Sequence, residues 1–332
     1  MTTWMEKPQE EDLLEEFHTP WQRVGRSLRH DRLAMWGAIV LIFFFALAIV
    51  GWWGTSGDDP YYSPSTVRLP DRLKPPMAKP NLDAVAPGEL PPLGFYLFGT
   101  DELGRDVFLR LLYGGRVSLF VALVAALAAA VIGTAIGILA GYRGGWADAL
   151  LMRLTDTVIA LPLLPLLIVL AKVDLAKLGL PAEAAHGEAA QLWRLIAIIA
   201  LFGWTTVARL VRGATLSVRE REFVRAAEAL GARSTRIMLV HILPNVMTPV
   251  IVATTLSMGG IVLFESVLSF LGLGVQPPMP SWGNMMTGAH ELIWAHAELV
   301  LYPGGLIFLT VIAFNFLGDG LQDAFDPRAA RR

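Results

Sequence analysis

The chain has 332 residues, of which 54% are hydrophobic and only 17% are charged, whereas ordinary soluble proteins carry about 25% charged residues. The mean hydropathy of +0.52 points to a membrane protein. With 27 Lys and Arg against 29 Asp and Glu, the net charge of −2 excludes a strongly basic nucleic-acid-binding protein. The absence of cysteine excludes disulfide scaffolds, thiolate metal sites and a cysteine nucleophile.

Six apolar stretches predict an all-α polytopic membrane protein, because a helix needs about 20 mostly apolar residues to cross the bilayer. The first stretch lies too far from the N-terminus for a cleaved signal peptide. The third contains Arg153 and Asp156, and the fourth is short, with Arg194 and Arg209 at its ends able to snorkel toward the two interfaces. The predicted spans are residues 34–54, 117–141, 151–171, 195–208, 242–264 and 299–318.

The distribution of basic residues predicts the orientation, since cytoplasmic loops are rich in Lys and Arg. The two tails, the turn between the second and third spans, and the loop 209–240 hold 17 of the 27 basic residues, whereas residues 272–297 hold none. Both termini and the loop 209–240 are therefore predicted to be cytoplasmic.

The first outer segment, residues 55–112, has nine prolines between Pro60 and Pro92. Such a segment favours extended, turn-rich chain, and we interpret it as a tether over the outer surface, with contact to the substrate as the alternative. Residues 98–119 follow, and their apolar spacing predicts an amphipathic helix at the interface, capped by Asp101.

Glycines and prolines within the spans predict packing and breaks. Gly133, Gly137 and Gly141 lie on one helix face, where small residues let helices approach closely. Prolines in the third, fifth and sixth spans predict broken helices of the kind that line a pathway. They are Pro162, Pro165, Pro244, Pro249 and Pro303.

The loop after the fourth span predicts a short cytoplasmic helix. Ser217 and Glu220 have the spacing of a capping box at its start, and Gly231 suits its end. Phe223, Ala227 and Leu230 share one face. A short amphipathic helix set across a loop is suited to dock into a groove on another protein.

This loop, EFVRAAEALGA…HILPN, resembles the signature loop of permease subunits in ATP-binding-cassette importers, although Arg225 replaces the usual Glu and His241 the usual Ile. Three further stretches resemble the C-type subunit of the dipeptide/oligopeptide/nickel branch: GTDELGRDVFLRLLYGGRVSL, ESVLSFLGLGVQPPMPSWGNM and NFLGDGLQDAFDPR. The resemblance runs from about Trp21 to the end of the chain.

The resemblance implies a type I importer fold in a bacterial or archaeal cytoplasmic (inner) membrane. The implied partners are a homologous permease subunit, two ATP-binding-cassette ATPase subunits, an extracytoplasmic solute-binding protein and membrane lipid, with no nucleic acid. We expect no cofactor or metal in this chain. No phosphate-binding loop surrounds any of its lysines, so ATP and Mg²⁺ would be bound by the ATPase subunits. The chain would not be an enzyme. It would form half of a pathway for di- or oligopeptides or a related solute such as a nickel complex or glutathione.

The implied organisation is a cytoplasmic tail (1–33), a first helix (34–54), an outer segment (55–112), a transmembrane core (113–318) with the coupling loop 209–240, and a cytoplasmic tail (319–332). The residues implied to couple the permease to the ATPase are Glu222, Phe223, Arg225, Ala226, Ala227, Leu230, Gly231 and Pro244. Candidates for pathway or packing roles are Asp156, Gly259, Gly260, Glu265 and Asn315.

Two alternatives remain open at this point. A proton-coupled secondary transporter would use buried acids, for which Asp156 and Glu265 are candidates, although capping, interfacial exposure or pairing also accounts for them. A membrane metalloprotease would use His290 and Glu291, but the fifth residue of an H-E-x-x-H motif is replaced by Trp294. The simpler interpretation of that segment is an outer interfacial helix with Trp282 and Trp294 at headgroup level.

Overall fold

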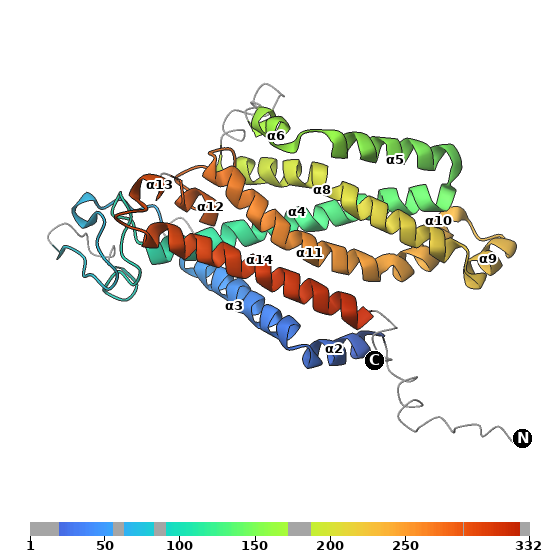
Figure 1. The fold of residues 1–332 in the computed structure, drawn as a ribbon, viewed down its shortest axis with the longest axis horizontal. Coiled ribbons are helices and arrows are strands. Elements are labelled where there is room, and N and C mark those ends of the chain that lie inside the picture. The colour runs from blue at the N-terminus through green and yellow to red at the C-terminus, as the bar shows by residue number, and fades with distance from the viewer. Residues whose placement is uncertain (1–19, 56–62, 83–90, 172–186, 288, 326–332) are drawn as a thin grey trace, which may run out of the picture.

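The computed structural model describes residues 20–55, 63–82, 91–171, 187–287 and 289–325, and this part of the chain is helical, without strands beyond two isolated bridges. The predicted all-α fold is confirmed. The main helices, in chain order, are α2 (Pro20–His30), α3 (Arg32–Thr55), α4 (Val107–Arg143), α5 (Gly145–Ala160), α6 (Leu163–Ala171), α8 (Glu188–Arg219), α9 (Glu222–Ala229), α11 (Leu243–Phe270) and α14 (Glu298–Phe325) (Figure 1). Shorter elements are η1 (Leu69–Asp71), α10 (Ser234–Arg236), the π-helical η4 (Ile237–Ile242), α12 (Trp282–Met285) and α13 (Ala289–Leu292).

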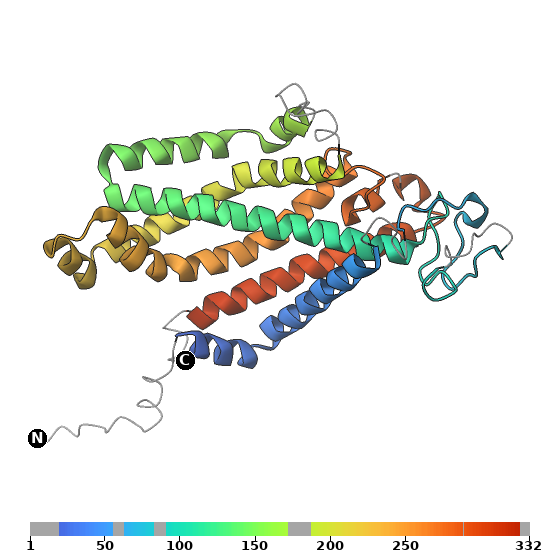
Figure 2. The ribbon, with the colours of Figure 1, turned by 180° about the vertical axis from the view of Figure 1, so that it is seen from behind.

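Five unbroken helical segments of the described chain are long and apolar enough to cross a membrane: α3, α4, α8, α14 and the continuous run from α10 through α11. The third predicted span is divided into α5 and α6. Leu161 is extended, with φ −69° and ψ 134°, as expected for a residue before a proline. Figures 1 and 2 show α5 and α6 following one another alongside α8, so the pair occupies the place of the third predicted span.

Two predicted helix boundaries are wrong. Asp106, not Asp101, caps the second span: its carboxylate accepts the amide hydrogens of Phe108 and Leu109 at 2.8 and 3.4 Å. The amphipathic stretch is therefore the first part of α4 rather than a separate interfacial helix. The fourth span extends over the 32 residues of α8, about 48 Å, because its buried side chains continue past the charged residues that seemed to limit it.

The prolines break fewer helices than predicted. The chain interrupts the helix at Pro162, but α11 continues through Pro249 and α14 continues through Pro303. Pro244 is the second residue of α11, directly after the π-helical η4, and the helical run continues through it.

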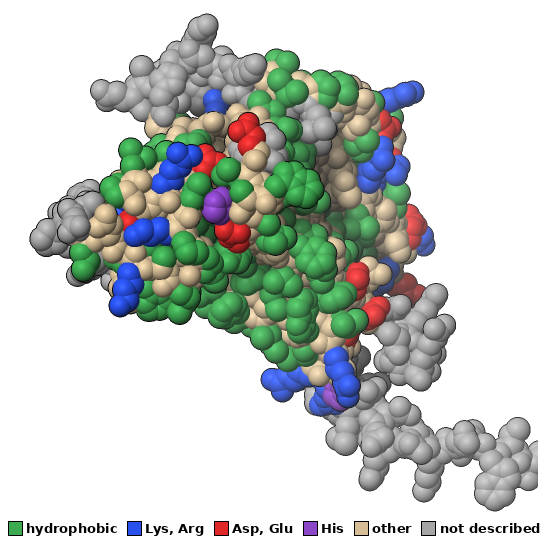
Figure 3. All heavy atoms as spheres, turned by 60° about the vertical axis from the view of Figure 1, so that its left-hand side comes forward, with side chains coloured by type: hydrophobic (Ala, Val, Ile, Leu, Met, Phe, Trp, Pro, Cys, Tyr) green, Lys and Arg blue, Asp and Glu red, His purple; other side chains and the backbone are tan. Residues whose placement is uncertain are grey.

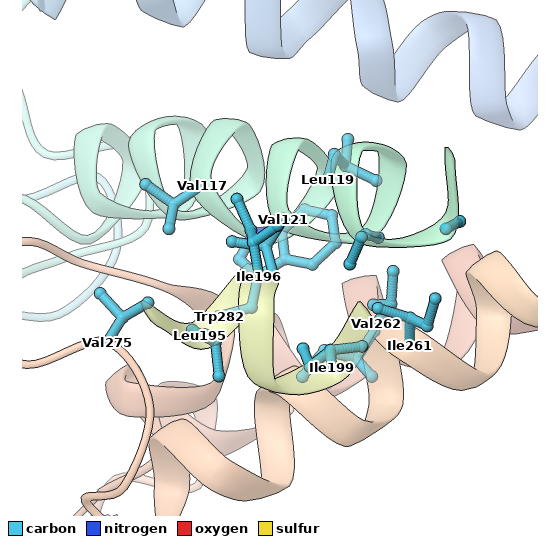
Figure 4. Close-up of a cluster of buried hydrophobic side chains, with 14 of the residues drawn as sticks. Val117, Leu119, Val121, Leu195, Ile196, Ile199, Ile261, Val262, Val275 and Trp282 are labelled. Carbon is cyan, nitrogen blue, oxygen red and sulfur yellow. The ribbon is translucent and has the colours of Figure 1, made fainter. Parts of the chain in front are cut away.

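The core lies where α4, α8, α11 and the chain after α11 meet. Figure 4 shows Val117 and Val121 of α4 facing Ile196 of α8, with Ile261 of α11 nearby. Trp282 is only 3% exposed and donates its indole hydrogen to the carbonyl oxygen of Leu111 at 3.0 Å. The interfacial position predicted for Trp282 is therefore wrong: the segment after α11 turns back into the bundle. The close neighbours of Trp282 are Gly114, Gly115 and Phe44.

Gly133, Gly137 and Gly141 of α4 pack against α8, which confirms the predicted close-packing face. A Cβ atom at Gly133 would lie 2.6 Å from the carbonyl oxygen of Trp204, and one at Gly137 would lie 2.6 Å from that of Ala208. At Gly141 it would lie 2.7 Å from the Cβ atom of Thr215. No larger side chain fits between these helices.

The described part of the first outer segment, residues 63–82 and 91–106, has no regular helix beyond the single turn η1, as its prolines predict. Asp71, which is 1% exposed, accepts hydrogen bonds from the Tyr96 hydroxyl at 2.7 Å and the Asn81 amide at 2.9 Å. Burial, together with the bond to this carboxylate, raises the pKa of Tyr96 to about 12. This segment lies at one end of the bundle, which we call the loop end (Figure 1).

At the opposite end of the bundle lie α2, α9 and the last turns of α14; we call it the α9 end (Figures 1 and 2). Viewed with the loop end forward, hydrophobic side chains cover a large continuous part of the surface (Figure 3). Many large apolar side chains are exposed, among them Ile42 at 69%, Val131 at 70% and Leu301 at 67%. Such a surface suits contact with lipid tails or other subunits.

Candidate coupling site

The short helix α9 stands at the tip of the bundle, between the end of α8 and the start of α11 (Figure 1). This helix ends just before Gly231, as the sequence predicts. Gly231 has φ +78°, and the amides of Gly231 and Ala232 donate to the carbonyl oxygens of Glu228 and Ala227 at 2.9 and 3.0 Å. This is the paired hydrogen-bond pattern that closes a helix on a left-handed glycine.

The predicted start of this helix is wrong. Ser217 lies inside α8, which continues to Arg219, and α9 begins only at Glu222. The helix therefore has 8 residues. The capping-box spacing misleads because Val218 is buried and keeps the last turn of α8 packed, while Glu220 forms an ion pair with Arg225 instead of capping.

Three contacts fix α9 to the rest of the subunit. Val224 is fully buried, in a cluster with Ile237 and Ile242. The Phe223 ring lies beside that of His241, with centroids 6.5 Å apart. These two contacts join α9 to the start of the α11 segment, so a displacement of α9 must displace that segment as well.

The third contact joins α9 to the end of α4. The Tyr142 hydroxyl donates to a Glu228 carboxylate oxygen at 3.2 Å, and the Arg219 guanidinium donates to the Tyr142 carbonyl oxygen at 3.1 Å. The last turns of α4 and α8 are thus linked with α9 through one tyrosine.

The outward surface of α9 is apolar at its centre and charged at its edge. Leu230 is 88% exposed and Phe223 is 40% exposed, and Ala226 between them is exposed as well. Leu239 and Val240 of η4 add exposed apolar area nearby in the sequence. Exposed large apolar side chains at the tip of a bundle indicate a protein contact.

This surface differs in one respect from the predicted face of Phe223, Ala227 and Leu230. Ala227 is half-buried and packs against the cluster of Val224, whereas Ala226 faces outward. Sequence spacing places residues on a common face but does not say which face meets the rest of the subunit, and here that face is the one of Val224.

Charged side chains surround the apolar centre. Glu222 and Arg225 are exposed. The hydrogen bond from Arg225 holds the pKa of Glu220 below its usual range, so this pair stays ionised at neutral pH. Of the remaining predicted coupling residues, Pro244 lies at the start of α11, beyond η4, and is exposed.

The candidate pathway residues are not gathered in one place. Glu265 is fully buried in α11 and accepts a hydrogen bond from the Ser269 hydroxyl at 2.7 Å. Gly259 is buried against Phe314 of α14, so it serves packing. Gly260 and Asn315 are exposed. The subunit itself buries Glu265, so this side chain needs no partner subunit to shield it from lipid.

Asp156 forms an ion pair with Arg209 of α8 at 2.5 Å, so pairing accounts for it as anticipated. A second pair between the same helices joins Arg212 with Asp148 through two hydrogen bonds of 2.5 and 2.6 Å. This second pair and the Tyr142 link were not predicted. Their partners are 64 and 86 residues apart in sequence, and no local pattern signals such contacts.

The comparisons with known proteins agree with this architecture. Residues 133–331 match the family described as binding-protein-dependent transport system inner membrane component. This chain belongs to that family. Residues 19–76 match the N-terminal TM domain of oligopeptide transport permease C. The chain is therefore a multi-pass inner-membrane permease of the ATP-binding-cassette class, as its sequence motifs indicated.

Three relatives cover nearly the whole chain. The dipeptide transport system permease protein DppC of Bacillus subtilis (strain 168) is 38% identical over 93% of this chain and 86% of its own length. The oligopeptide transport system permease protein OppC of the same organism is 33% identical over 93% and 90%. The glutathione transport system permease protein GsiD of Escherichia coli O6:K15:H31 is 35% identical over 95% and 92%.

Proposed function

We propose that this permease is one half of the translocation pathway of an ATP-driven importer, and that α9 is its coupling helix. The observation that carries the proposal is the outward apolar surface of Phe223, Ala226 and Leu230 on a short helix at the tip of the bundle. An 8-residue helix fits a cleft on a partner protein, where its apolar side chains leave water. The partner would be an ATPase subunit.

In this proposal, closure of the ATPase subunits moves α9, and the contacts behind α9 carry the motion inward. Val224 would transmit the displacement to η4 and α11 through its cluster with Ile237 and Ile242. Glu228 would transmit it to α4 through the hydrogen bond with Tyr142. The close contact of the α4 glycines with α8 makes those two helices one rigid unit. ATP and Mg²⁺ would be bound by the ATPase subunits and not by this chain.

The proposed assembly contains a homologous permease subunit, two ATPase subunits and an extracytoplasmic solute-binding protein, in contact with membrane lipid. The α9 end would face the cytoplasm, together with both termini, because the basic residues gather there. The names of the relatives support short peptides, or a related solute such as glutathione, as the transported class. The domain boundaries that we propose for this chain are those that its sequence implies.

A pair of substitutions at one position tests α9. Ala226→Trp adds a large side chain to the outward surface without touching the Val224 cluster, and Ala226→Ser is the matched control. In proteoliposomes holding the full complex, we expect Ala226→Trp to abolish ATP hydrolysis stimulated by the solute-binding protein and to reduce co-purification of the ATPase subunits. Ala226→Ser should keep both. Equal stimulation in the two variants would show that α9 is not the coupling element.

A carrier driven by an ion gradient remains a separate hypothesis, and one experiment separates it. The permease pair is reconstituted with and without the ATPase subunits, and uptake of a labelled dipeptide is measured. We expect uptake only with the ATPase subunits and ATP. Uptake by this chain alone in ATP-free liposomes would contradict the importer proposal.

A further inference from the structure

The ion pair of Asp156 and Arg209 at the α5–α8 contact is open to the surface, unlike the neighbouring pair of Asp148 and Arg212. The two side chains are 56% and 50% exposed, although their charged atoms are only 2.5 Å apart. In the neighbouring pair, Asp148 is 17% exposed and Arg212 is 34% exposed. A half-exposed ion pair on a membrane helix needs a polar environment.

Arg209 ends the uncharged part of α8, which is shorter than the hydrocarbon layer is thick. Arg194 and Arg209 delimit the uncharged part of α8, and their 15-residue separation corresponds to about 22 Å. The hydrocarbon layer is about 30 Å thick, so both residues cannot lie outside it. A long arginine side chain can reach toward an interface. The short carboxylate of Asp156 cannot reach as far, so at any depth within the hydrocarbon it requires water or polar groups beside it.

The exposed surface of α5 has two faces of different character. On one face, Ala149, Arg153, Asp156 and Ala160 recur at helical spacing, and all four are exposed; we call this row the polar stripe. On the adjoining face, Trp146, Leu150 and Leu154 are 79%, 60% and 51% exposed. Large apolar side chains suit lipid tails, whereas the charged side chains of Arg153 and Asp156 require water or polar groups.

We infer that the polar stripe lines the water-filled pathway and that Asp156 and Arg209 together form a site for a zwitterionic solute. This inference rests on the proposed function, since it names where an importer would contact its substrate. The carboxylate of Asp156 matches the ammonium group of an unblocked peptide, and the guanidinium of Arg209 matches its terminal carboxylate, which it can bind through two parallel hydrogen bonds. With no solute present, the two side chains form an ion pair with each other.

The first test measures whether the stripe meets water. The chain has no native cysteine, so single cysteines are introduced at Ala149 and Ala160 on the stripe, with Leu150 and Leu154 on the apolar face as controls. The assembled complex in membranes is treated with a charged, membrane-impermeant methanethiosulfonate reagent, and labelling of this chain is read by mass spectrometry. We expect labelling at the two stripe positions only. Equal labelling on both faces, or no labelling on the stripe, would overturn the inference.

The second test measures whether the pair recognises charged ends. Asp156→Asn and Arg209→Gln are compared with the wild type in uptake of alanyl-alanine and of its N-acetylated form. We expect Asp156→Asn to raise the KM for alanyl-alanine about ten-fold, the loss of one charge-assisted hydrogen bond, and to leave uptake of the acetylated form unchanged. Arg209→Gln should weaken both, because both peptides keep the carboxylate. Asp156→Glu should restore most of the uptake.

Two outcomes separate this inference from the proposed function. If Asp156→Asn impairs both peptides equally and also lowers stimulated ATP hydrolysis, the pair is structural and the inference is wrong, while the importer proposal stands. If the wild-type complex carries neither peptide, the assigned solute class is wrong, and the cysteine labelling still decides whether the stripe faces water.

Discussion

Gly137→Ala is the sharpest test of the helix contact on which the proposed motion depends. The added Cβ atom would lie 2.6 Å from the carbonyl oxygen of Ala208, 2.8 Å from the Cβ atom of Val211 and 3.0 Å from the amide nitrogen of Arg212. Ordinary contacts between such atoms begin near about 3.5 Å, so α4 and α8 must separate by roughly 1 Å. Overpacking of this kind costs about 1–3 kcal/mol. Alanine recovers only about 0.5–1 kcal/mol through its better helix propensity.

The assay compares Gly137→Ala with Gly213→Ala, a substitution on α8 where no atom lies within 4 Å of the new Cβ. Unfolding of the complex is followed in a mixed-micelle denaturant titration by circular dichroism. We expect Gly137→Ala to lower the free energy of unfolding by about 1–2 kcal/mol, and Gly213→Ala to leave it unchanged or raise it slightly. A Gly137→Ala variant as stable as Gly213→Ala would refute the close contact.

Three further predictions follow from other positions. Gly231→Ala should destabilise the end of α9 by about 1–2 kcal/mol, because the φ of +78° at this position is unfavourable for a residue with a side chain. We expect Gly231→Ala to lower solute-stimulated ATP hydrolysis and Gly231→Asn to restore part of it. Burial raises the pKa of Asp106 to about 6, although the amide hydrogen bonds at the α4 cap oppose the shift. Because this pKa exceeds the ordinary value of about 4, the contribution of Asp106 to the stability of the folded protein is full below about pH 4 and is lost as the pH rises through 6. The melting temperature of Asp106→Asn should therefore vary less between pH 4 and 7 than that of the wild type. A cysteine at Ser65 should react with an impermeant reagent from outside intact cells, and reaction only after permeabilisation would contradict the proposed orientation.

Local chemistry explains why some features of this permease were predictable. The apolar stretches identify most of the spans, because a helix in lipid must satisfy its own backbone and present apolar side chains. Gly231 identifies the end of α9, since only a residue tolerant of positive φ closes a helix in this way. Gly133, Gly137 and Gly141 identify a packing face by their spacing alone.

Boundaries and orientations were less predictable, because competing local signals are decided by packing. Ser217 and Glu220 have the spacing of a cap, yet the burial of Val218 extends α8 through them. Trp282 has the composition of an interfacial residue, yet the chain after α11 turns back and buries it. In each case a contact with a distant helix outweighed a local preference.

Residues close together in the chain were enough to indicate the membrane location, the family and the glycine that closes α9. The packing of the helices settles which side of α9 faces outward, that Glu265 is enclosed by its own subunit, and that Asp156 meets Arg209 on an exposed surface. These are contacts between helices. Helix periodicity fixes the relative directions of side chains within one helix, but the rotation of each helix about its axis is set by its neighbours.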